Sequence, residues 1–155
     1  MANTSLGKKF EQKFKEDWLK LPDVSIDRIN DNFNGYKNIS GISDFIGYHY
    51  PNIFYLENKE HTGNTFPFAN LTQYEKLLAK QGIKGVRVGV VLWFSDHDTV
   101  VYVPVQTVTK MMADGKKSVN IKDIDNYEIV RVPSIKKRTF MDSDYSCLFN
   151  LPEGW

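Results

Sequence analysis

Cysteine is nearly absent from the sequence, which contains it once, as Cys147. A single thiol excludes an intramolecular disulfide framework and a multi-cysteine zinc site. The sequence also has no apolar run that approaches the roughly 18 residues of a membrane span. Residues 1–18, MANTSLGKKFEQKFKEDW, carry acids and lack the apolar core of a secretory leader. These features predict a cytoplasmic protein that does not contact a membrane.

The short motifs of several large enzyme classes are missing as well. The sequence contains no G-x-x-x-x-G-K-[ST] phosphate loop, no G-x-G-x-x-G and no G-x-S-x-G. ATP hydrolysis, dinucleotide chemistry and the serine-hydrolase arrangement are therefore not supported.

A strong excess of one charge is also lacking, since 20 basic and 19 acidic residues leave a net charge of +1. The positions of the basic residues are more informative than their number. They form three separated clusters: Lys8, Lys9, Lys13 and Lys15; Lys116 and Lys117; and Lys136, Lys137 and Arg138. Such clusters could follow a phosphate backbone, and the alternative is a set of solvated surface lysines.

What the sequence does contain is enough apolar residues for a proper core, 41% of 155 residues. We expect a single domain over residues 1–155, with the core over about 6–132 and a C-terminal tail over 133–155. Aromatic residues in that tail suggest that it packs onto the body or onto a partner.

Hydrophobic periodicity predicts the secondary structure. Phe10, Phe14 and Trp18 form one apolar face of a first helix that Ser5 can cap, and Thr72 with Glu75 makes a capping box for a second helix. The expected elements are a helix over 6–21, strands over 24–29, 44–48 and 53–58, a helix over 71–81, strands over 86–94 and 99–104, a helix over 105–112 and a strand over 127–132. This order predicts an α/β fold with a mixed central β-sheet flanked by helices.

The most informative stretch joins a lone carboxylate, Asp44, to an apolar run that ends in Glu57-Asn58-Lys59. Because side chains two apart on a strand share a face, Glu57 and Lys59 should project together while Leu56 and Asn58 face away. Two carboxylates, waters and a backbone carbonyl such as that of Asn58 suffice for a hydrated Mg²⁺. The ammonium of Lys59 could stabilise the charge that develops during phosphodiester cleavage. This set predicts a nuclease active site.

Each candidate has a structural alternative. Glu57 and Lys59 could be an ordinary surface pair on a strand, and Glu11 could be a solvated acid that pairs with Lys15 at i+4. The trio at 96–98, Asp-His-Asp, resembles a metal site but lies in an expected hairpin turn, where Asp is common. We interpret it as turn chemistry.

At these residues the sequence resembles the PD-(D/E)xK nuclease superfamily, which has the restriction-endonuclease-like fold. It is most similar to RecU-type Holliday-junction resolvases of Gram-positive bacteria and their phages. The similar segments are GKKFE at 7–11, SD at 43–44 and LENKEHTGNTFPFANLTQYE at 56–75, and together the similarity covers roughly residues 7–125. A short member of this kind would suit a phage or a mobile element.

The resemblance implies a role for each site residue. Asp44 and Glu57 would hold the divalent metal, and Lys59 would assist the attacking water. Gln73 would position that water or a phosphate. Glu11 would contribute from the first helix, directly or through a metal-bound water.

The resemblance also implies a homodimer that places two sites symmetrically on a four-way junction. Trp18, Phe140 and Phe149 are candidates for the dimer interface by their size alone. Two features depart from the family: Ser43 replaces a proline of the motif, and the segment before Asp44 is shorter than the stalk of the bacterial resolvases. These departures affect substrate preference more than chemistry.

The sequence therefore predicts an Mg²⁺-dependent DNA endonuclease, with Mn²⁺ as a substitute, that resolves Holliday junctions by paired nicks through water attack on the phosphodiester. Two alternatives are a nuclease for flaps or forks and a non-catalytic protein that binds branched DNA. The residues expected to contact DNA are Lys8, Lys9, Lys13, Arg28, Lys37 and Thr65.

Overall fold

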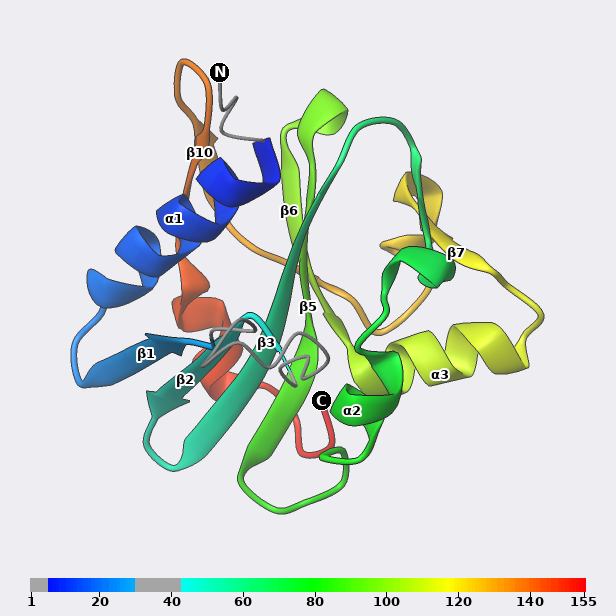
Figure 1. Ribbon diagram of the computed structural model, residues 1–155, viewed down its shortest axis with the longest axis horizontal. Helices are drawn as coiled ribbons and strands as arrows, with labels where there is room; N and C mark the ends of the chain where they lie inside the picture. The colour runs from blue at the N-terminus through cyan, green and yellow to red at the C-terminus, as the bar shows by residue number, and fades with distance from the viewer. Residues whose placement is uncertain (1–5, 30–42) are drawn as a thin grey trace, which may run out of the picture.

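A computed structural model describes residues 6–29 and 43–155 of the chain, and Ser5 and Lys37 lie outside these ranges. Its centre is a six-stranded sheet with the order β1-β2-β3-β5-β6-β8 (Figure 1). The strands are β1 (Val24–Arg28), β2 (Phe45–His49), β3 (Asn52–His61), β5 (Val86–Phe94), β6 (Thr99–Pro104) and β8 (Val130–Arg131). Neighbouring strands are antiparallel except β3 and β5, which run parallel. The predicted mixed sheet is confirmed, although its last strand is shorter than the expected 127–132.

Helices cover both faces of this sheet (Figure 1). On one face α1 (Leu6–Leu19) packs on β1 and β3, and its residues Phe14 and Trp18 are fully buried. On the other face α2 (Tyr74–Leu78) and α3 (Val105–Ala113) bury Leu77 and Met111 against β5 and β6. None of the helices in the described residues is both long and apolar enough to cross a membrane.

Helix α1 follows the predicted apolar periodicity and ends two residues earlier than expected. The backbone N–H groups of Lys20 and Leu21 bond back three residues, to Asp17 and Trp18, and this tightens the last turn. The helix lies very close to β2, because a Cβ on Gly47 would be only 2.8 Å from Cζ2 of Trp18. This close approach packs the second half of α1 against the middle of β2.

The second predicted helix is wrong in length. We expected it over 71–81, and α2 spans only Tyr74–Leu78. The preceding residues form a 3-10 turn, η2 (Phe68–Asn70), which buries Phe68 and Leu71 in the core. The expected capping box with Thr72 is absent: Gln73 is the N-cap residue without a side-chain cap bond, and Thr72 donates to the Gln73 side chain instead.

Residues 63–68, which the sequence presents as a connection, contain a strand. It is β4 (Thr65–Pro67), and it pairs antiparallel with β7 (Ser118–Asn120). Asn120 strengthens this pair, since its side-chain amide donates to Oγ1 of Thr65 at 2.7 Å. The small sheet fastens the chain after β3 to a segment far along the sequence.

The C-terminal residues form part of the core rather than a separate tail. A hairpin of β9 (Ser134–Lys136) and β10 (Met141–Ser143) is followed by a 3-10 helix, η5 (Tyr145–Asn150). Within η5, Tyr145 and Leu148 are fully buried, and the Tyr145 ring packs 4.7 Å from that of Phe14.

This packing corrects two of the candidates for the dimer interface. Trp18 has no exposed surface, and Phe149 packs edge-on against it at 5.4 Å within the same chain. Both rings therefore stabilise the monomer. Phe140 is the most open of the three, with 40% of its surface exposed, whereas Phe149 is only partly buried.

Candidate active site

Strand register brings Asp44 and Glu57 together. Phe45 pairs with Leu56 in the antiparallel ladder of β2 and β3, so the preceding residue, Asp44, lies opposite Glu57. Residues directly opposite in such a pair project on the same face. The backbone N–H of Asn58 donates to Oδ2 of Asp44 at 2.8 Å, which fixes the Asp44 carboxylate beside Glu57.

Lys59 lies on β3, the strand that carries Glu57, and is close to both carboxylates. Glu57 and Lys59 are two residues apart on β3 and therefore share a face, as the sequence predicts. Leu56 packs in the core cluster that includes Phe10 and Phe14 of α1. Nζ of Lys59 lies 3.9 Å from Oε1 of Glu57. The Lys59 side chain is partly exposed, whereas only 1% of the Glu57 side chain is exposed. The ammonium is therefore the more accessible of the two groups.

The environment of Glu57 strongly disfavours a lone negative charge. Burial, followed by the hydrogen bond and the charge of neighbouring Asp44, raises the pKa of Glu57 to about 9, against the opposing effect of the Lys59 ammonium. Its Oε2 atom is buried and has no hydrogen-bond partner among the described residues. Buried polar atoms are normally satisfied, so this oxygen is suited to receive a cation.

Glu11 reaches the same region from α1. It pairs with Arg28 at the end of β1, Oε1 to NH2 at 3.3 Å, and not with Lys15 as the alternative interpretation required. Burial and the charge of Asp44 raise the pKa of Glu11, and Arg28 opposes this shift. The sequence could not reveal this pairing because it joins a helix and a strand.

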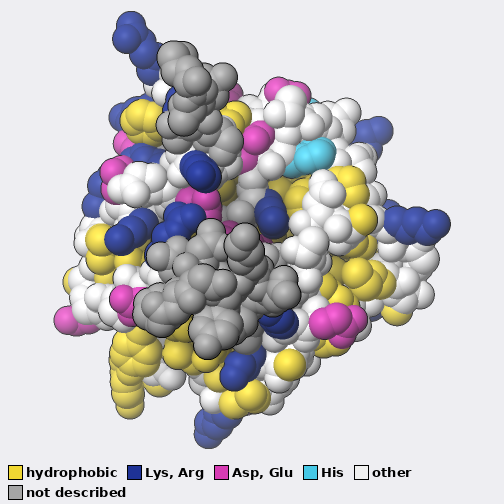
Figure 2. All heavy atoms as spheres, in the orientation of Figure 1, with side chains coloured by type: hydrophobic (Ala, Val, Ile, Leu, Met, Phe, Trp, Pro, Cys, Tyr) yellow, Lys and Arg dark blue, Asp and Glu magenta, His cyan; other side chains and the backbone are white. Residues whose placement is uncertain are grey.

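These residues line one cavity of about 310 Å³. Figure 2 shows acidic side chains near the middle of this face, bordered by lysine and arginine. The cavity is lined by Gly7, Lys8, Glu11, Asp44, Glu57, Asn58, Lys59, Glu60 and Gln73. The structure thus brings together all five residues predicted to be catalytic.

Glu60 is a lining residue that the sequence analysis missed. Its Oε2 accepts hydrogen bonds from Oγ of Ser95 at 2.5 Å and from Oγ1 of Thr62 at 3.1 Å. Ser95 lies in the turn between β5 and β6, so these bonds tie the end of β3 to the neighbouring turn. The motif E-N-K-E places Glu60 directly after Lys59, but its partner could not be identified from spacing.

The residues predicted to contact DNA do not all lie at this cavity. Lys8 lines it and Arg28 borders it through Glu11, whereas Lys9 and Lys13 line a different cavity on the other side of α1. Thr65 belongs to β4 and accepts a hydrogen bond from Asn120. Lys37 lies outside the described residues.

The three side chains at 96–98 each contact a different partner. Asp96 accepts from the backbone N–H of Gly63, His97 pairs with Asn64, and Asp98 pairs with Lys136. Within the described ranges, no three His, Cys, Asp or Glu side chains form a group that could hold a metal by themselves. The interpretation of this trio as turn chemistry agrees with these contacts.

The donor atoms at the cavity fit a hard divalent cation. Asp44 and Glu57 offer carboxylate oxygens, including the unpartnered Oε2 of Glu57, and the two acids repel each other unless a positive charge intervenes. Mg²⁺ prefers oxygen ligands and usually keeps several waters, so two carboxylates and a backbone carbonyl are sufficient. The carbonyl oxygen of Asn58 is the further ligand expected from the sequence, and the Oδ1 and Nδ2 atoms of its side chain are buried without a hydrogen-bond partner among the described residues.

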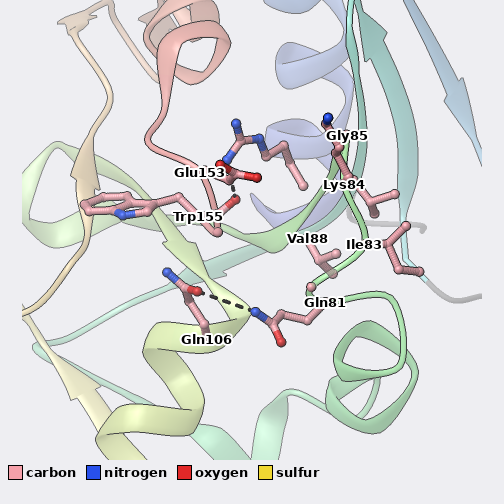
Figure 3. A pocket seen from close by; sticks show the side chains of 12 residues that line it. Gln81, Ile83, Lys84, Gly85, Val88, Gln106, Glu153 and Trp155 are labelled. Carbon is pink, nitrogen blue, oxygen red and sulfur yellow. Dashed lines mark hydrogen bonds between the residues drawn. The ribbon is translucent and has the colours of Figure 1, made fainter.

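Another cavity, of about 130 Å³, lies at the opposite end of β5, where Gln81 and Gln106 hydrogen-bond (Figure 3). Arg87 donates to the backbone carbonyls of Leu151, Pro152 and Trp155 beside this cavity. Its lining contains no pair of carboxylates. The contacts of Arg87 hold residues 151–155 against the sheet.

Comparisons with known proteins agree with this architecture. The family model described as "RecU: Recombination protein U" matches residues 22–142. Among solved structures, Hjc of Archaeoglobus fulgidus, described as a Holliday junction resolvase from an archaeal hyperthermophile, matches with a TM-score of 0.56 and 15% identity over 78% of this chain and 93% of that chain. No curated protein matches the sequence. The structural match confirms the predicted restriction-endonuclease-like α/β fold.

Proposed function

The chain belongs to the RecU family of recombination proteins, and on this basis we propose that it is a metal-dependent DNA endonuclease that resolves Holliday junctions. The observation that carries the proposal is the convergence of Asp44, Glu57 and Lys59 on one face of β2 and β3, at the mouth of one cavity. Two carboxylates beside an ammonium suit the cleavage of a phosphodiester. The description of Hjc as a Holliday junction resolvase adds support for this substrate.

Asp44 and Glu57 would hold Mg²⁺, with the backbone carbonyl of Asn58 as a further ligand and Mn²⁺ as a substitute. A bound divalent cation supplies positive charge at the phosphate and lowers the pKa of a coordinated water. The hydrogen bond from the Asn58 N–H keeps the Asp44 carboxylate oriented toward the cavity. Glu57 offers Oε2, which has no other partner in the described part of the chain.

The remaining residues would act on the water and the phosphate. The Lys59 ammonium, held near Glu57, would orient the attacking water and stabilise the charge on the phosphate oxygens. The water oxygen would form the new bond to phosphorus as one P–O bond of the backbone breaks; the water would lose a proton and the leaving oxygen would take one up by exchange with solvent, without a covalent enzyme intermediate. Gln73 would position the water or a phosphate, and Glu11 would contribute through a water while paired with Arg28.

Resolution of a four-way junction requires two symmetric nicks. We propose that a homodimer supplies two copies of the site and that Lys8 and Arg28, at the cavity, contact the DNA backbone. Phosphate contacts of this kind position the substrate without reading its sequence.

The substitution Asp44→Ala tests this function. The variant should lose junction cleavage and keep junction binding, because Asp44 would hold the metal, whereas the proposed contacts with the DNA backbone come from Lys8 and Arg28. Asp125→Ala is the matched control, since Asp125 is an exposed acid whose ion-pair partner in the described part of the chain is Arg131. Retained cleavage in the Asp44 variant would overturn the assignment. Cleavage of forks or flaps in preference to junctions would move the proposal to another branched substrate.

A further inference from the structure

A third cavity, of about 200 Å³, lies between α1 and the β9–β10 hairpin. We propose that this hairpin cavity holds one unpaired base at the branch point of the DNA substrate, stacked on Phe140. The inference rests on the proposed function and adds a base-binding site to it. The lining residues are Lys9, Phe10, Lys13, Glu16, Trp93, Thr139, Phe140 and Met141.

The walls of the hairpin cavity are aromatic and apolar. Phe10, Trp93 and Met141 are buried, and the rings of Phe10 and Trp93 pack 5.6 Å apart. Phe140 is 40% exposed in the turn of the hairpin, where the backbone N–H of Lys137 bonds to its carbonyl oxygen. Partly exposed aromatic rings are the platforms on which proteins stack unpaired bases, because every base has a π-face.

Trp93 provides a second, independent feature. The Nε1 atom of its indole ring is buried and has no hydrogen-bond partner within the described residues. An indole N–H can only donate, and buried donors are rarely left unsatisfied. Bases carry carbonyl and ring-nitrogen acceptors at their edges. A polar aromatic ligand therefore matches this wall better than a purely aliphatic one.

The lining of the hairpin cavity contains two lysines, Lys9 and Lys13, and one acid, Glu16. Lys13 is neutralised by Asp17 and Asp142, and its ammonium lies 5.0 Å from the centre of the Phe140 ring. Lys9 lines the cavity, and Arg138 is adjacent in sequence to the lining residue Thr139; both are exposed, and neither makes an ion pair with any residue of the described ranges. These two cations are available for the phosphates on either side of a stacked base.

The hairpin cavity also lies next to the active site. The first half of α1 separates the two: Lys8 and Glu11 line the catalytic cavity, and Lys9 and Phe10 line the hairpin cavity. On the sheet, Glu60 of the catalytic cavity pairs in register with Trp93. A strand whose phosphate is cleaved at Glu57 and Lys59 would therefore pass close to the hairpin cavity.

The test measures junction binding in EDTA, which prevents cleavage, with 2-aminopurine placed either at the branch point or within an arm. Wild-type protein should change the fluorescence of the branch-point probe and leave the arm probe unchanged. Phe140→Ala should abolish that change and raise the Kd for the junction by about 5- to 150-fold, the usual effect of losing one base stack. The Kd for unbranched duplex should not change.

Three further variants make the test specific. Phe140→Trp should restore both the fluorescence change and the affinity, because it restores the stacking surface. Ile135→Ala is the control: this residue is 66% exposed on the same hairpin and does not line the cavity, so its variant should behave as wild type. Lys9→Ala should keep the fluorescence change and reduce the salt dependence of binding by about one charge.

Different outcomes would overturn the two proposals. A silent branch-point probe, or unchanged binding by Phe140→Ala, with normal junction cleavage by the wild type would overturn the base-binding site alone. If the wild type is a dimer without DNA and Phe140→Ala is a monomer, the hairpin cavity binds a second copy of the chain. This result would also overturn the base-binding site. If the wild type binds no branched DNA, the proposed function itself fails.

Discussion

Nζ of Lys59 lies 3.9 Å from Oε1 of Glu57, two residues away on the same face of β3. The strand thus presents a buried carboxyl group, Glu57, and an accessible ammonium, Lys59. Asp44, which directly precedes β2, lies beside them. Burying a carboxylate next to another carboxylate lowers stability, and the Lys59 charge offsets only part of this effect. Such an arrangement is expected where function, and not stability, determines the residues.

Lys59→Ala should lower the rate of junction cleavage by about 100- to 10,000-fold, the usual range for loss of one group that acts on a reacting proton or charge. Binding to the junction in EDTA should remain within about fivefold, because one phosphate contact at most is lost. Single-turnover cleavage and a binding titration measure the two effects.

Lys84→Ala provides the control for this change. Lys84 is exposed near the start of β5, at the other end of the sheet from Lys59. Its variant should cleave at the wild-type rate. Wild-type cleavage by Lys59→Ala would remove Lys59 from the mechanism.

Glu57 should make metal-free stability depend on pH. It takes up its proton at a pKa of about 9 in the folded protein and at 4.5 in the reference state. Between about pH 5 and pH 8 the folded state therefore holds a proton that the unfolded chain has released. The free energy of unfolding should fall as pH rises through this window, by up to about 1.4 kcal/mol per pH unit.

Glu57→Gln isolates that contribution. The neutral amide cannot ionise, so the variant should lose this part of the pH dependence and gain stability relative to the wild type as pH rises. Urea unfolding in EDTA at several pH values measures the difference. Parallel pH profiles for the two proteins would contradict the environment assigned to Glu57.

Leu148→Ala should lower the free energy of unfolding by about 2–5 kcal/mol, because Leu148 is fully buried in the cluster beneath α1. Leu19→Ala is the control, since 53% of Leu19 is exposed, and its effect should be within about 0.5 kcal/mol. A change no larger than the control would show that residues 145–150 are not part of the folded core.

The proposed homodimer predicts a mass in solution of about twice 17.9 kDa by light scattering. Two sites related by two-fold symmetry are needed for paired nicks on a symmetric junction. A monomer at the concentrations that support cleavage would contradict paired nicking, although single nicks could persist.

Much of the fold could be predicted because its strongest patterns are local. The apolar face of α1 and the continuous apolar strand β5 appear directly in the sequence. The site could also be predicted from the sequence, because side chains two apart on a strand share a face, as Glu57 and Lys59 do on β3. The opposition of Asp44 then follows from the pairing of two strands that are adjacent in sequence.

The features that the sequence did not reveal depend on distant residues. Strand β4 forms only because β7 pairs with it, and Thr65 and Asn120 are separated by 55 positions. The partner of Glu11 is Arg28 rather than the local Lys15, and that of Glu60 is Ser95 in another turn. The helix expected from residue 71 begins only at Tyr74, after a 3-10 turn at which Phe68 and Leu71 are buried in the core.

The most direct test of the account is incubation of the purified protein with an end-labelled four-way junction in EDTA, Mg²⁺ or Mn²⁺. A forked duplex and a linear duplex of the same sequence serve as controls. We expect symmetric paired nicks in the junction with either metal, no cleavage in EDTA and little cleavage of the linear duplex. Tight binding of the junction with no cleavage in either metal would contradict it.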